Sequence, residues 1–229
     1  PCRGKIDELV KIEYLNLSNL NIENLKFLNC FTHLEWLNLD NNRIIDITPL
    51  TSLKNLKTLL LRNNENMNFE LLKKIQCLDF LCLDKNNIQN IDFLSELINL
   101  EYLSLNENNI EDITPLKNLI NLNNLYISDN KIQDIFILKK LTNLISIHIS
   151  RNQLKYIDAF SELTNLESLS FMDNQVENVM PLENLKQLES LDLYGNPISL
   201  NDKKKLSNLL SKWEYEIDIT DVLTPFIKD

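Results

Sequence analysis

Glycine, histidine and long apolar runs are scarce in this chain, and each shortage argues against a class of site. Only two of the 229 residues are glycine, Gly4 and Gly195, so no glycine-rich loop is present to cradle a phosphate or a dinucleotide. The two histidines, His33 and His148, lie far apart in the sequence, and we expect no metal site. No segment approaches the roughly 18 uninterrupted apolar residues of a membrane helix. We therefore expect no cofactor and no membrane insertion.

Positive charge is also in short supply, because the chain carries a net charge of −10. Nucleic acids and anionic membranes are bound by clustered lysine and arginine, so neither is the expected partner. An acidic chain instead favours solubility and a protein partner with a basic surface.

The feature that organises the chain is an apolar pattern repeated every 22 residues. The repeats start at Ile12, Leu34, Leu56, Leu78, Leu100, Leu122, Leu144, Leu166 and Leu188. Counting each start as position 0, apolar residues follow at +3 and +5, and eight of the nine residues at +8 are asparagine, the exception being Leu20. A fixed period of this length predicts a solenoid with one structural unit per repeat.

Each repeat has two parts with different spacing. The first alternates apolar and polar residues, which predicts a short strand with one buried face. The return leg has apolar residues at +13, +16 and +19, a spacing typical of a 3₁₀ helix, and Pro49, Pro115 and Pro181 stand at +15, where proline opens a helix. An amide both donates and accepts, so the +8 asparagines are expected to satisfy buried backbone groups in a ladder. In the third repeat Asn66 replaces the usual isoleucine, which predicts a local bulge refilled by Met67, Phe69 and Leu71.

The pattern divides the chain into three parts. Residues 1–11 are expected to be an N-terminal cap or a truncated repeat, since Ile6 and Leu9 match the return-leg spacing. Residues 12–198 are the repeats, and residues 199–229 a C-terminal cap and tail. Asn201 or Asp202 is expected to cap a helix in the last part. Its apolar face would comprise Leu206, Leu209, Leu210 and Trp213, with residues 214–219 as a closing strand.

The four cysteines Cys2, Cys30, Cys77 and Cys82 are expected to be free thiols. Cys77 and Cys82 would lie roughly 16 Å apart along one extended segment, which is too far for a disulfide. Free thiols favour a cytoplasmic, reducing compartment. The chain begins with proline rather than methionine, so its true start is not visible and bacterial export stays open.

These motifs resemble the 22-residue class of leucine-rich repeats, as in bacterial internalins and the nuclear regulatory subunit of protein phosphatase 1. The resemblance covers residues 12–198, and Gly195-Asn196-Pro197-Ile198 before a lysine-rich helix is similar to the end cap of many bacterial members. It implies an α/β solenoid: a right-handed horseshoe with a parallel sheet on its concave face, short helical segments on its convex face and a helical C-terminal cap. It further implies protein binding by the concave face and no catalysis, but it transfers no particular partner.

Bulky side chains form a diagonal stripe across the predicted concave face. Their position shifts from +2 in the earlier repeats to +4 and then +6 in the later ones. We call this set the aromatic stripe; it comprises Trp36, Phe80 and Tyr102 at +2, Tyr126 and His148 at +4, and Met172 and Tyr194 at +6. With strands about 4.8 Å apart it would span roughly 34 Å, an extent typical of an interaction site. The competing hypothesis is that these rings only stack on one another and fill the inner curve.

Charged residues on the same face are predicted to select the partner. The set comprises Arg62, Asp84, Glu107 and Asp129. Most of the chain's net negative charge falls at +1, +4, +6 and +7, which would steer a basic partner towards the sheet.

The sequence therefore predicts a non-enzymatic, monomeric scaffold that binds a protein through its concave face. Two alternatives stay open. One is an exported bacterial internalin-like adhesin or effector that binds a host protein. The other is a structural spacer within a longer protein, whose stripe would tolerate mutation without loss of activity.

Overall fold

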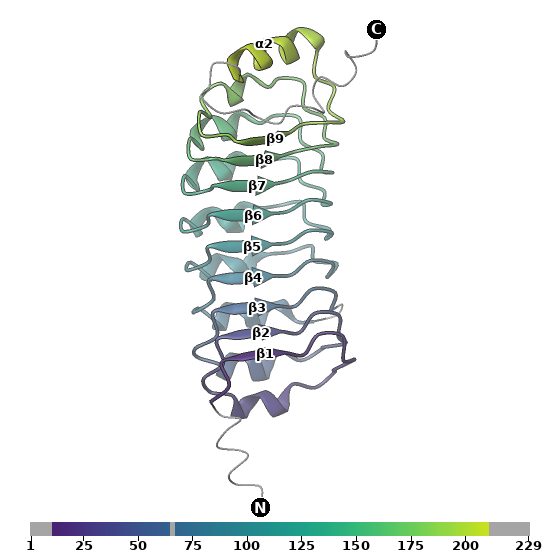
Figure 1. Ribbon diagram of the computed structural model, residues 1–229. Coiled ribbons are helices and arrows are strands. Elements are labelled where there is room, and N and C mark those ends of the chain that lie inside the picture. Colours follow the sequence, from purple (N-terminus) through teal and green to yellow (C-terminus); the bar gives the residue numbers. More distant parts are fainter. Residues whose placement is uncertain (1–10, 65–66, 211–229) are drawn as a thin grey trace, which may run out of the picture.

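The computed structural model describes residues 11–64 and 67–210, and the repeats form one continuous stack of coils (Figure 1). Nine strands form one sheet in chain order, all pairs being parallel. They are β1 (Tyr14–Asn16), β2 (Trp36–Asn38), β3 (Thr58–Leu60), β4 (Phe80–Cys82), β5 (Tyr102–Ser104), β6 (Asn124–Tyr126), β7 (Ser146–His148), β8 (Ser168–Ser170) and β9 (Ser190–Asp192). The expected solenoid with a parallel sheet on its concave face is confirmed.

The return legs are 3₁₀ helices on the side opposite the sheet (Figure 1). They are η1 (Lys26–Cys30), η2 (Thr48–Ser52), η3 (Phe69–Lys74), η4 (Asp92–Glu96), η5 (Thr114–Asn118), η6 (Phe136–Lys140), η7 (Asp158–Glu162) and η8 (Met180–Leu182). Pro49, Pro115 and Pro181 enter the first turn of their legs, where a missing N–H costs no helical bond. The predicted 3₁₀ spacing and the role of the prolines are confirmed.

The strands pair without any slip, so a position in one repeat lies beside the same position in the next. Tyr14 pairs with Trp36, Trp36 with Thr58, and Thr58 with Phe80. The sequence period of 22 residues is thus converted into straight columns of side chains up the sheet. Any binding surface on the concave face is therefore made of residues from these columns.

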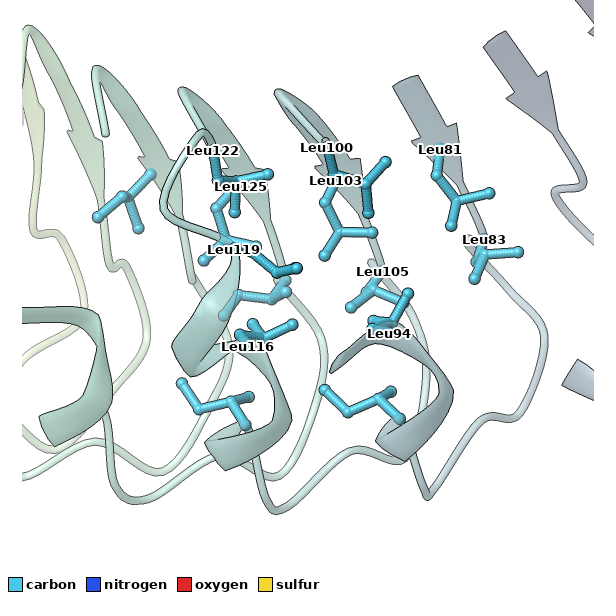
Figure 2. Packing of buried hydrophobic residues seen from close by; sticks show 14 of the residues in the cluster. Leu81, Leu83, Leu94, Leu100, Leu103, Leu105, Leu116, Leu119, Leu122 and Leu125 are labelled. Carbon is cyan, nitrogen blue, oxygen red and sulfur yellow. The ribbon is translucent and has the colours of Figure 1, made fainter. Parts of the chain in front are cut away.

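The core lies between the sheet and the return legs, and the repeated apolar positions fill it. In the fifth repeat Leu100, Leu103, Leu105, Leu116 and Leu119 are all completely buried. Figure 2 shows such side chains from strands and legs pointing toward one another between the two layers. Because each coil packs on its neighbours, a continuous core forms without any repeat burying its own apolar face alone.

The +8 asparagines form the expected ladder beneath the turns. In the fifth repeat the Asn108 amide nitrogen donates to the carbonyls of Leu83 and Leu105, each at 3.0 Å. Its carbonyl oxygen accepts the backbone N–H groups of Asn86 at 3.1 Å and Ile88 at 2.9 Å. The buried members of this asparagine ladder are Asn42, Asn64, Asn86, Asn108, Asn130, Asn152 and Asn174. The first repeat, where Leu20 replaces asparagine, leaves that side chain exposed, as expected of a terminal turn.

The residue just before each ladder position has a left-handed backbone, which the sequence analysis did not anticipate. All nine residues at +7 have φ between 49° and 73°; they are Asn19, Asn41, Asn63, Lys85, Glu107, Asp129, Arg151, Asp173 and Gly195. This conformation turns the chain off the strand, and asparagine, aspartate and glycine tolerate it best. At Lys85, Glu107 and Arg151 it costs on the order of 1 kcal/mol each.

The third repeat keeps its register but changes its leg, as expected. η3 starts at repeat position +13, one earlier than η2 and η4, and all three end at +18. The Asn68 side chain accepts the Glu70 N–H at the start of η3. Met67 is buried, and the Phe69 ring stacks on Phe93 with 5.9 Å between centroids. Asn66 lies outside the described residues.

The C-terminal helix α2 (Leu200–Leu210) is present, but its predicted cap is wrong. Ser199, not Asn201 or Asp202, is the capping residue: its hydroxyl accepts the Asp202 N–H at 3.1 Å, and its carbonyl accepts the Lys203 N–H. The helix begins earlier than predicted because a serine three residues before an acid forms a capping pair. Leu206 is buried under the helix, as predicted. Several predictions lie outside the described residues or side chains: Cys2, Ile6, Leu9, Leu209, Leu210, Trp213 and 214–219.

Candidate protein-binding surface

Four rings of the aromatic stripe form one continuous stack on the concave sheet. Phe80 on β4 lies against Tyr102 on β5 with 3.9 Å between centroids and 6° between planes. Tyr102 contacts Tyr126 on β6 at 5.1 Å, and Tyr126 contacts His148 on β7 at 4.7 Å. The step from +2 to +4 falls between Tyr102 and Tyr126, so the stack runs diagonally, as the sequence predicts. We call these four residues the ring stack.

The other three members of the stripe do not join the ring stack. Thr58 separates Trp36 from Phe80 in the +2 column. Within residues 11–64 and 67–210, neither Trp36 nor Tyr194 forms a ring pair. Trp36 and Met172 are half-buried, whereas Tyr194 is exposed. The stripe is therefore a stack of four rings with separate bulky residues beyond its two ends.

Stacking decides which parts of these rings face solvent. Since Tyr102 and Tyr126 each have a ring neighbour on both sides, their faces are largely used within the protein. Their edges and hydroxyl groups are what a partner would meet. Burial raises the pKa of Tyr102 to about 12, helped by neighbouring Tyr126 and by Cys82 and Asp84. Its phenol therefore stays protonated and able to donate at any physiological pH.

His148 ends the ring stack, and burial lowers its pKa below the ordinary 6.5, against a smaller opposing effect of the Asp192 carboxylate. The folded chain thus holds this proton less readily than the unfolded chain. We expect the free energy of unfolding to fall as the pH drops below about 6.5 and through the lowered pKa. Denaturant titrations of the parent and of His148→Gln between pH 7.5 and pH 5 measure this.

The variant should lose less stability than the parent over that pH range. Asp40 and Asp79, whose pKa values are raised chiefly by burial, act in the opposite direction but are common to both proteins. Their contribution cancels in the difference. Equal pH dependence in the two proteins would contradict the assignment to His148.

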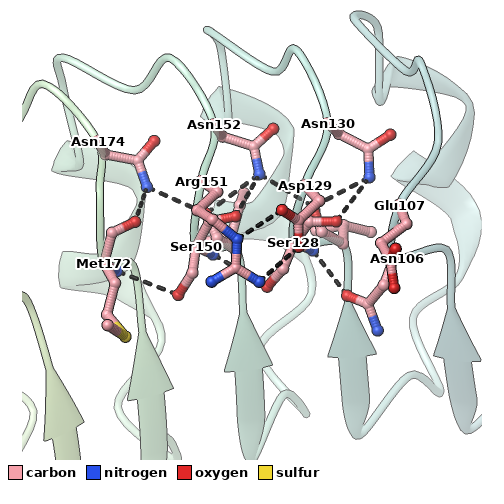
Figure 3. Close-up of polar contacts among 12 residues, drawn as sticks. Asn106, Glu107, Ser128, Asp129, Asn130, Ser150, Arg151, Asn152, Met172 and Asn174 are labelled. Atoms are coloured by element: carbon pink, nitrogen blue, oxygen red, sulfur yellow. Dashed lines mark hydrogen bonds and ion pairs between the residues drawn. The ribbon is translucent and has the colours of Figure 1, made fainter.

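The +6 column, where Asp84 was predicted to contact the partner, is occupied by internal hydrogen bonds. Asp84 Oδ1 accepts the Ser104 hydroxyl at 2.6 Å and the Asn106 N–H at 2.8 Å. The series continues from Asn106 to Ser128 and on to Ser150, which accepts the Met172 N–H (Figure 3). These side chains satisfy the backbone of the next repeat, so Asp84 has a structural role whatever else it contacts.

The charged residues at +7 are paired across repeats. Lys85 Nζ lies 2.9 Å from Glu107 Oε1. The Arg151 guanidinium donates twice to Asp129, with Nη2 at 2.6 Å from Oδ2 (Figure 3). Glu107 and Asp129, both predicted to select a basic partner, therefore already have cations beside them. Arg62, the remaining predicted charge, is exposed.

At the other edge of the sheet, where the strands begin, acidic residues outnumber lysine and arginine at the same repeat position. We call this the strand-start edge; its acids at +1 are Glu13, Glu35, Asp79, Glu101, Glu167 and Glu189. Lys57, the single cation at +1, is paired with Glu35 at 2.8 Å. The pKa of Asp79 is raised by burial and then by neighbouring Glu101, so these two carboxylates repel one another. The negative field of the concave face is therefore concentrated along this edge.

A second row of amides was missed in the sequence. Five asparagines at +21 each donate their side-chain N–H to the backbone carbonyl 23 residues earlier, at 2.8–3.0 Å. They are Asn55, Asn99, Asn121, Asn143 and Asn165. Cys77 holds this position in the third repeat and donates its thiol to the Leu56 carbonyl. The recurrence of asparagine at +21 in the sequence could have revealed this row. The five asparagines of this row lie at the ends of their return legs and are exposed, unlike the asparagine ladder.

The described cysteines are free, as predicted, and two are poorly suited to react. Burial raises the pKa of the Cys82 thiol to about 12 and raises that of Cys77 above its usual range. A thiol is nucleophilic as its thiolate, so both stay in the unreactive form. Cys30 is exposed, and Cys2 lies outside the described residues.

The described residues also offer neither a metal site nor a membrane-spanning helix. Among residues 11–64 and 67–210, no three histidine, cysteine, aspartate or glutamate side chains are grouped closely enough to hold a metal ion. No helix among them has both the length and the apolar character to cross a membrane.

Known proteins with leucine-rich repeats are similar to this chain in sequence and in fold. The family model for leucine-rich repeats in two copies matches residues 78–118 and again 120–162. By sequence, none of the curated proteins matches. Among solved structures, internalin C2 of Listeria monocytogenes is 30% identical with a TM-score of 0.78, the match covering 82% of this chain and 83% of that one.

Two other solved structures are similar. An internalin of Listeria monocytogenes, InlF, is 30% identical with a TM-score of 0.82, over 96% of this chain and 67% of that one. A leucine-rich-repeat protein of Leptospira interrogans is 26% identical with a TM-score of 0.74, over 94% of this chain and 62% of that one. The 22-residue period, the asparagine ladder and these likenesses agree: this chain belongs to the leucine-rich-repeat family of protein-interaction modules and is of the internalin type.

Proposed function

We propose that this chain is a non-catalytic module that binds a protein partner through its concave face. The observation that carries the proposal is the ring stack, four rings in contact across four strands on a face that the core does not need. A solenoid offers an extended surface of this kind for another protein. Aromatic groups held rigidly at the centre of a surface are typical binding anchors.

The ring stack and the strand-start edge together describe the partner. The ring edges and the Tyr102 and Tyr126 hydroxyls would contact apolar and hydrogen-bonding groups. The unbalanced acids along the strand-start edge would face lysine or arginine, which speeds encounter and fixes orientation. A partner with an apolar ridge bordered on one side by basic residues fits both features.

Affinity capture with matched variants tests the proposal. The immobilised parent is compared with the triple variant Trp36→Ala, Tyr102→Phe and Tyr126→Phe, which keeps the stacked rings but removes the indole and both hydroxyls. The control is Ile98→Ala with Ile120→Ala, which trims two exposed apolar side chains outside the sheet. A protein held by the parent and the control but lost from the triple variant is the expected result. Equal recovery from all three would contradict concave binding.

A second function is favoured by the likeness to two Listeria monocytogenes internalins: an exported bacterial adhesin or effector that binds a host protein. It would use the same concave surface. Parallel capture from animal-cell and bacterial lysates separates the two functions. Recovery of the concave-dependent partner from the animal-cell lysate alone would support the exported function, and recovery from the bacterial lysate alone would contradict it.

A further inference from the structure

Polar side chains at +12 and +14 satisfy groups at the start of most return legs. In seven repeats the residue at +12 is an aspartate or asparagine whose side chain accepts the N–H two residues later at 2.7–3.2 Å. These are Asn24, Asp46, Asn68, Asn90, Asp112, Asp134 and Asn178. The Asn90 amide also donates to the Asp92 carboxylate, and the Thr114 hydroxyl donates to the Asp112 carboxylate, both at 2.9 Å. In the fourth and fifth repeats an acid at one position thus has a polar partner at the other.

Two aromatic residues interrupt this pattern in adjacent repeats. Tyr156 stands at +12 in the seventh repeat, and 76% of its surface is exposed. Phe136 stands at +14 in the sixth, as the first residue of η6, and 60% of its surface is exposed. Neither ring is buried in the core, and Tyr156 forgoes the capping side chain of the other repeats. The fold therefore does not account for either ring.

Each ring shares its repeat with an exposed acid. Asp134 stands at +12 in the sixth repeat and Asp158 at +14 in the seventh, so acids and rings alternate over the two legs. Asp134 Oδ1 accepts the Phe136 N–H at 2.7 Å, but in the part of the chain that the structure describes neither carboxylate is in an ion pair. The aromatic residue gives neither acid the amide or threonine partner found in the fourth and fifth repeats.

The two rings and the two acids line one open hollow of about 400 Å³, together with buried Ile135 and Ala159. Among the described residues, no lysine or arginine lines it. Lys139 Nζ lies 3.5 Å from the centroid of the Phe136 ring, so this ring already attracts one cation from outside the hollow. The hollow therefore combines two aromatic rings with two carboxylates that have no cation of their own.

We propose that this hollow is a docking site for an arginine side chain of a protein partner. The guanidinium group would lie against Phe136 and Tyr156 and donate to Asp134 and Asp158, because aromatic faces and carboxylates both attract a cation. Arginine fits better than lysine, since its planar group stacks on rings, carries donors for two carboxylates and is less strongly hydrated. The site lies on the return-leg side, so it is separate from the concave surface and its test does not depend on the ring stack.

Peptides of defined sequence test the chemistry of the occupant. A nine-residue glycine–serine peptide with one central arginine is titrated into the isotope-labelled chain, and the backbone amide signals are followed by NMR. Matched peptides carry citrulline, lysine or trimethyl-lysine in place of the arginine. We expect saturable shifts at residues 134–136 and 156–159 with arginine, at least fivefold weaker binding with lysine or trimethyl-lysine, and none with citrulline.

Three results of this titration would overturn the proposal. One is the absence of saturable shifts at these residues with the arginine peptide. Another is saturable binding of the citrulline peptide, which has nearly the shape of arginine without its charge. The third is binding of the lysine or trimethyl-lysine peptide as tightly as the arginine peptide, which would make the hollow a site for ammonium groups.

Two double variants place the binding on the rings and on the acids. The ring variant is Phe136→Thr with Tyr156→Asn, and the acid variant is Asp134→Asn with Asp158→Thr. Both install residues that other repeats carry at the same positions, so their melting temperatures should stay close to that of the parent. We expect each to weaken binding of the arginine peptide at least tenfold. Unchanged affinity in either variant would refute the site.

A matched control separates this site from the general attraction of a cation to an acidic chain. Asp112→Asn with Asp92→Thr makes the same two substitutions at +12 and +14 in repeats that carry no ring there. It should change the affinity less than twofold, and weakening equal to that of the acid variant would contradict the proposal. A dimer of the parent that sedimentation detects and the ring variant abolishes would make the occupant a second copy of this chain, and would also overturn it.

Discussion

Replacing Asn108 with alanine is expected to lower the free energy of unfolding by about 3 kcal/mol, because several buried backbone groups lose their partner at once. The amide nitrogen donates to the carbonyls of Leu83 and Leu105, each just after a strand, and the amide oxygen accepts two backbone N–H groups from the preceding repeat. The Asn108 side chain is buried, so no water replaces these bonds without opening the turn. Denaturant-induced unfolding followed by circular dichroism measures the loss.

The exposed row of amides at +21 supplies the matched control. Asn121→Ala removes one asparagine hydrogen bond, to the Ile98 carbonyl at 3.0 Å, but at a site that water reaches. We expect a loss below about 1 kcal/mol. A similar loss in the two variants would mean that burial of the ladder is not what makes it stabilising.

Truncation of Tyr102 to alanine is expected to weaken binding of the concave partner by about 1–3 kcal/mol, the range of a central anchor residue. It should also destabilise the fold by about 2 kcal/mol, because the ring loses Phe80 on one side and Tyr126 on the other. From the sequence alone, the binding hypothesis predicts that this truncation leaves stability nearly unchanged, and only the filling hypothesis predicts a loss. Because the structure shows the rings stacked, a loss of stability is expected under both, so only the affinity distinguishes them. Calorimetric titration of the captured protein into the parent and into Tyr102→Ala measures this affinity.

Tyr102→Phe separates the two roles, because it keeps the stacked ring and removes only the hydroxyl. We expect its stability to stay within about 0.5 kcal/mol of the parent, with binding weakened by about 1 kcal/mol through loss of one hydrogen bond. If Tyr102→Ala bound the partner as tightly as the parent does, the ring stack would be structural filling alone.

Most of the fold was predictable because the same constraints recur in nearly every one of the nine repeats. Apolar residues at 0, +3 and +5 and asparagine at +8 specify a strand, a turn and a register together, and the structure confirms each. The exceptions are places where a local interaction competes with the pattern. Ser199 caps α2 because its hydroxyl lies three residues before Asp202, a local pairing that outweighs the acid and amide further on.

The candidate site was predicted as a set of positions, but not as a set of contacts. Column positions place Tyr102 and Tyr126 on adjacent strands in neighbouring columns, +2 and +4, yet whether their rings stack or splay depends on side-chain torsions that a sequence does not display. The charges illustrate the same point. Because the +7 residues adopt a left-handed backbone, Glu107 reaches Lys85 and Asp129 reaches Arg151 in the adjacent repeats. A tally of acids at those positions therefore overstates the charge left for a partner.

Hydroxyl-radical footprinting of the chain with and without its captured partner tests the central claim most directly, because it reports on side chains one by one. Concave binding predicts that the partner protects Trp36, Phe80, Tyr102 and Tyr126 from oxidation. Exposed Phe27, in η1 on the side opposite the sheet, serves as the reference for unchanged reactivity. Unchanged oxidation of the ring stack, with protection found only on the return legs, would contradict the account.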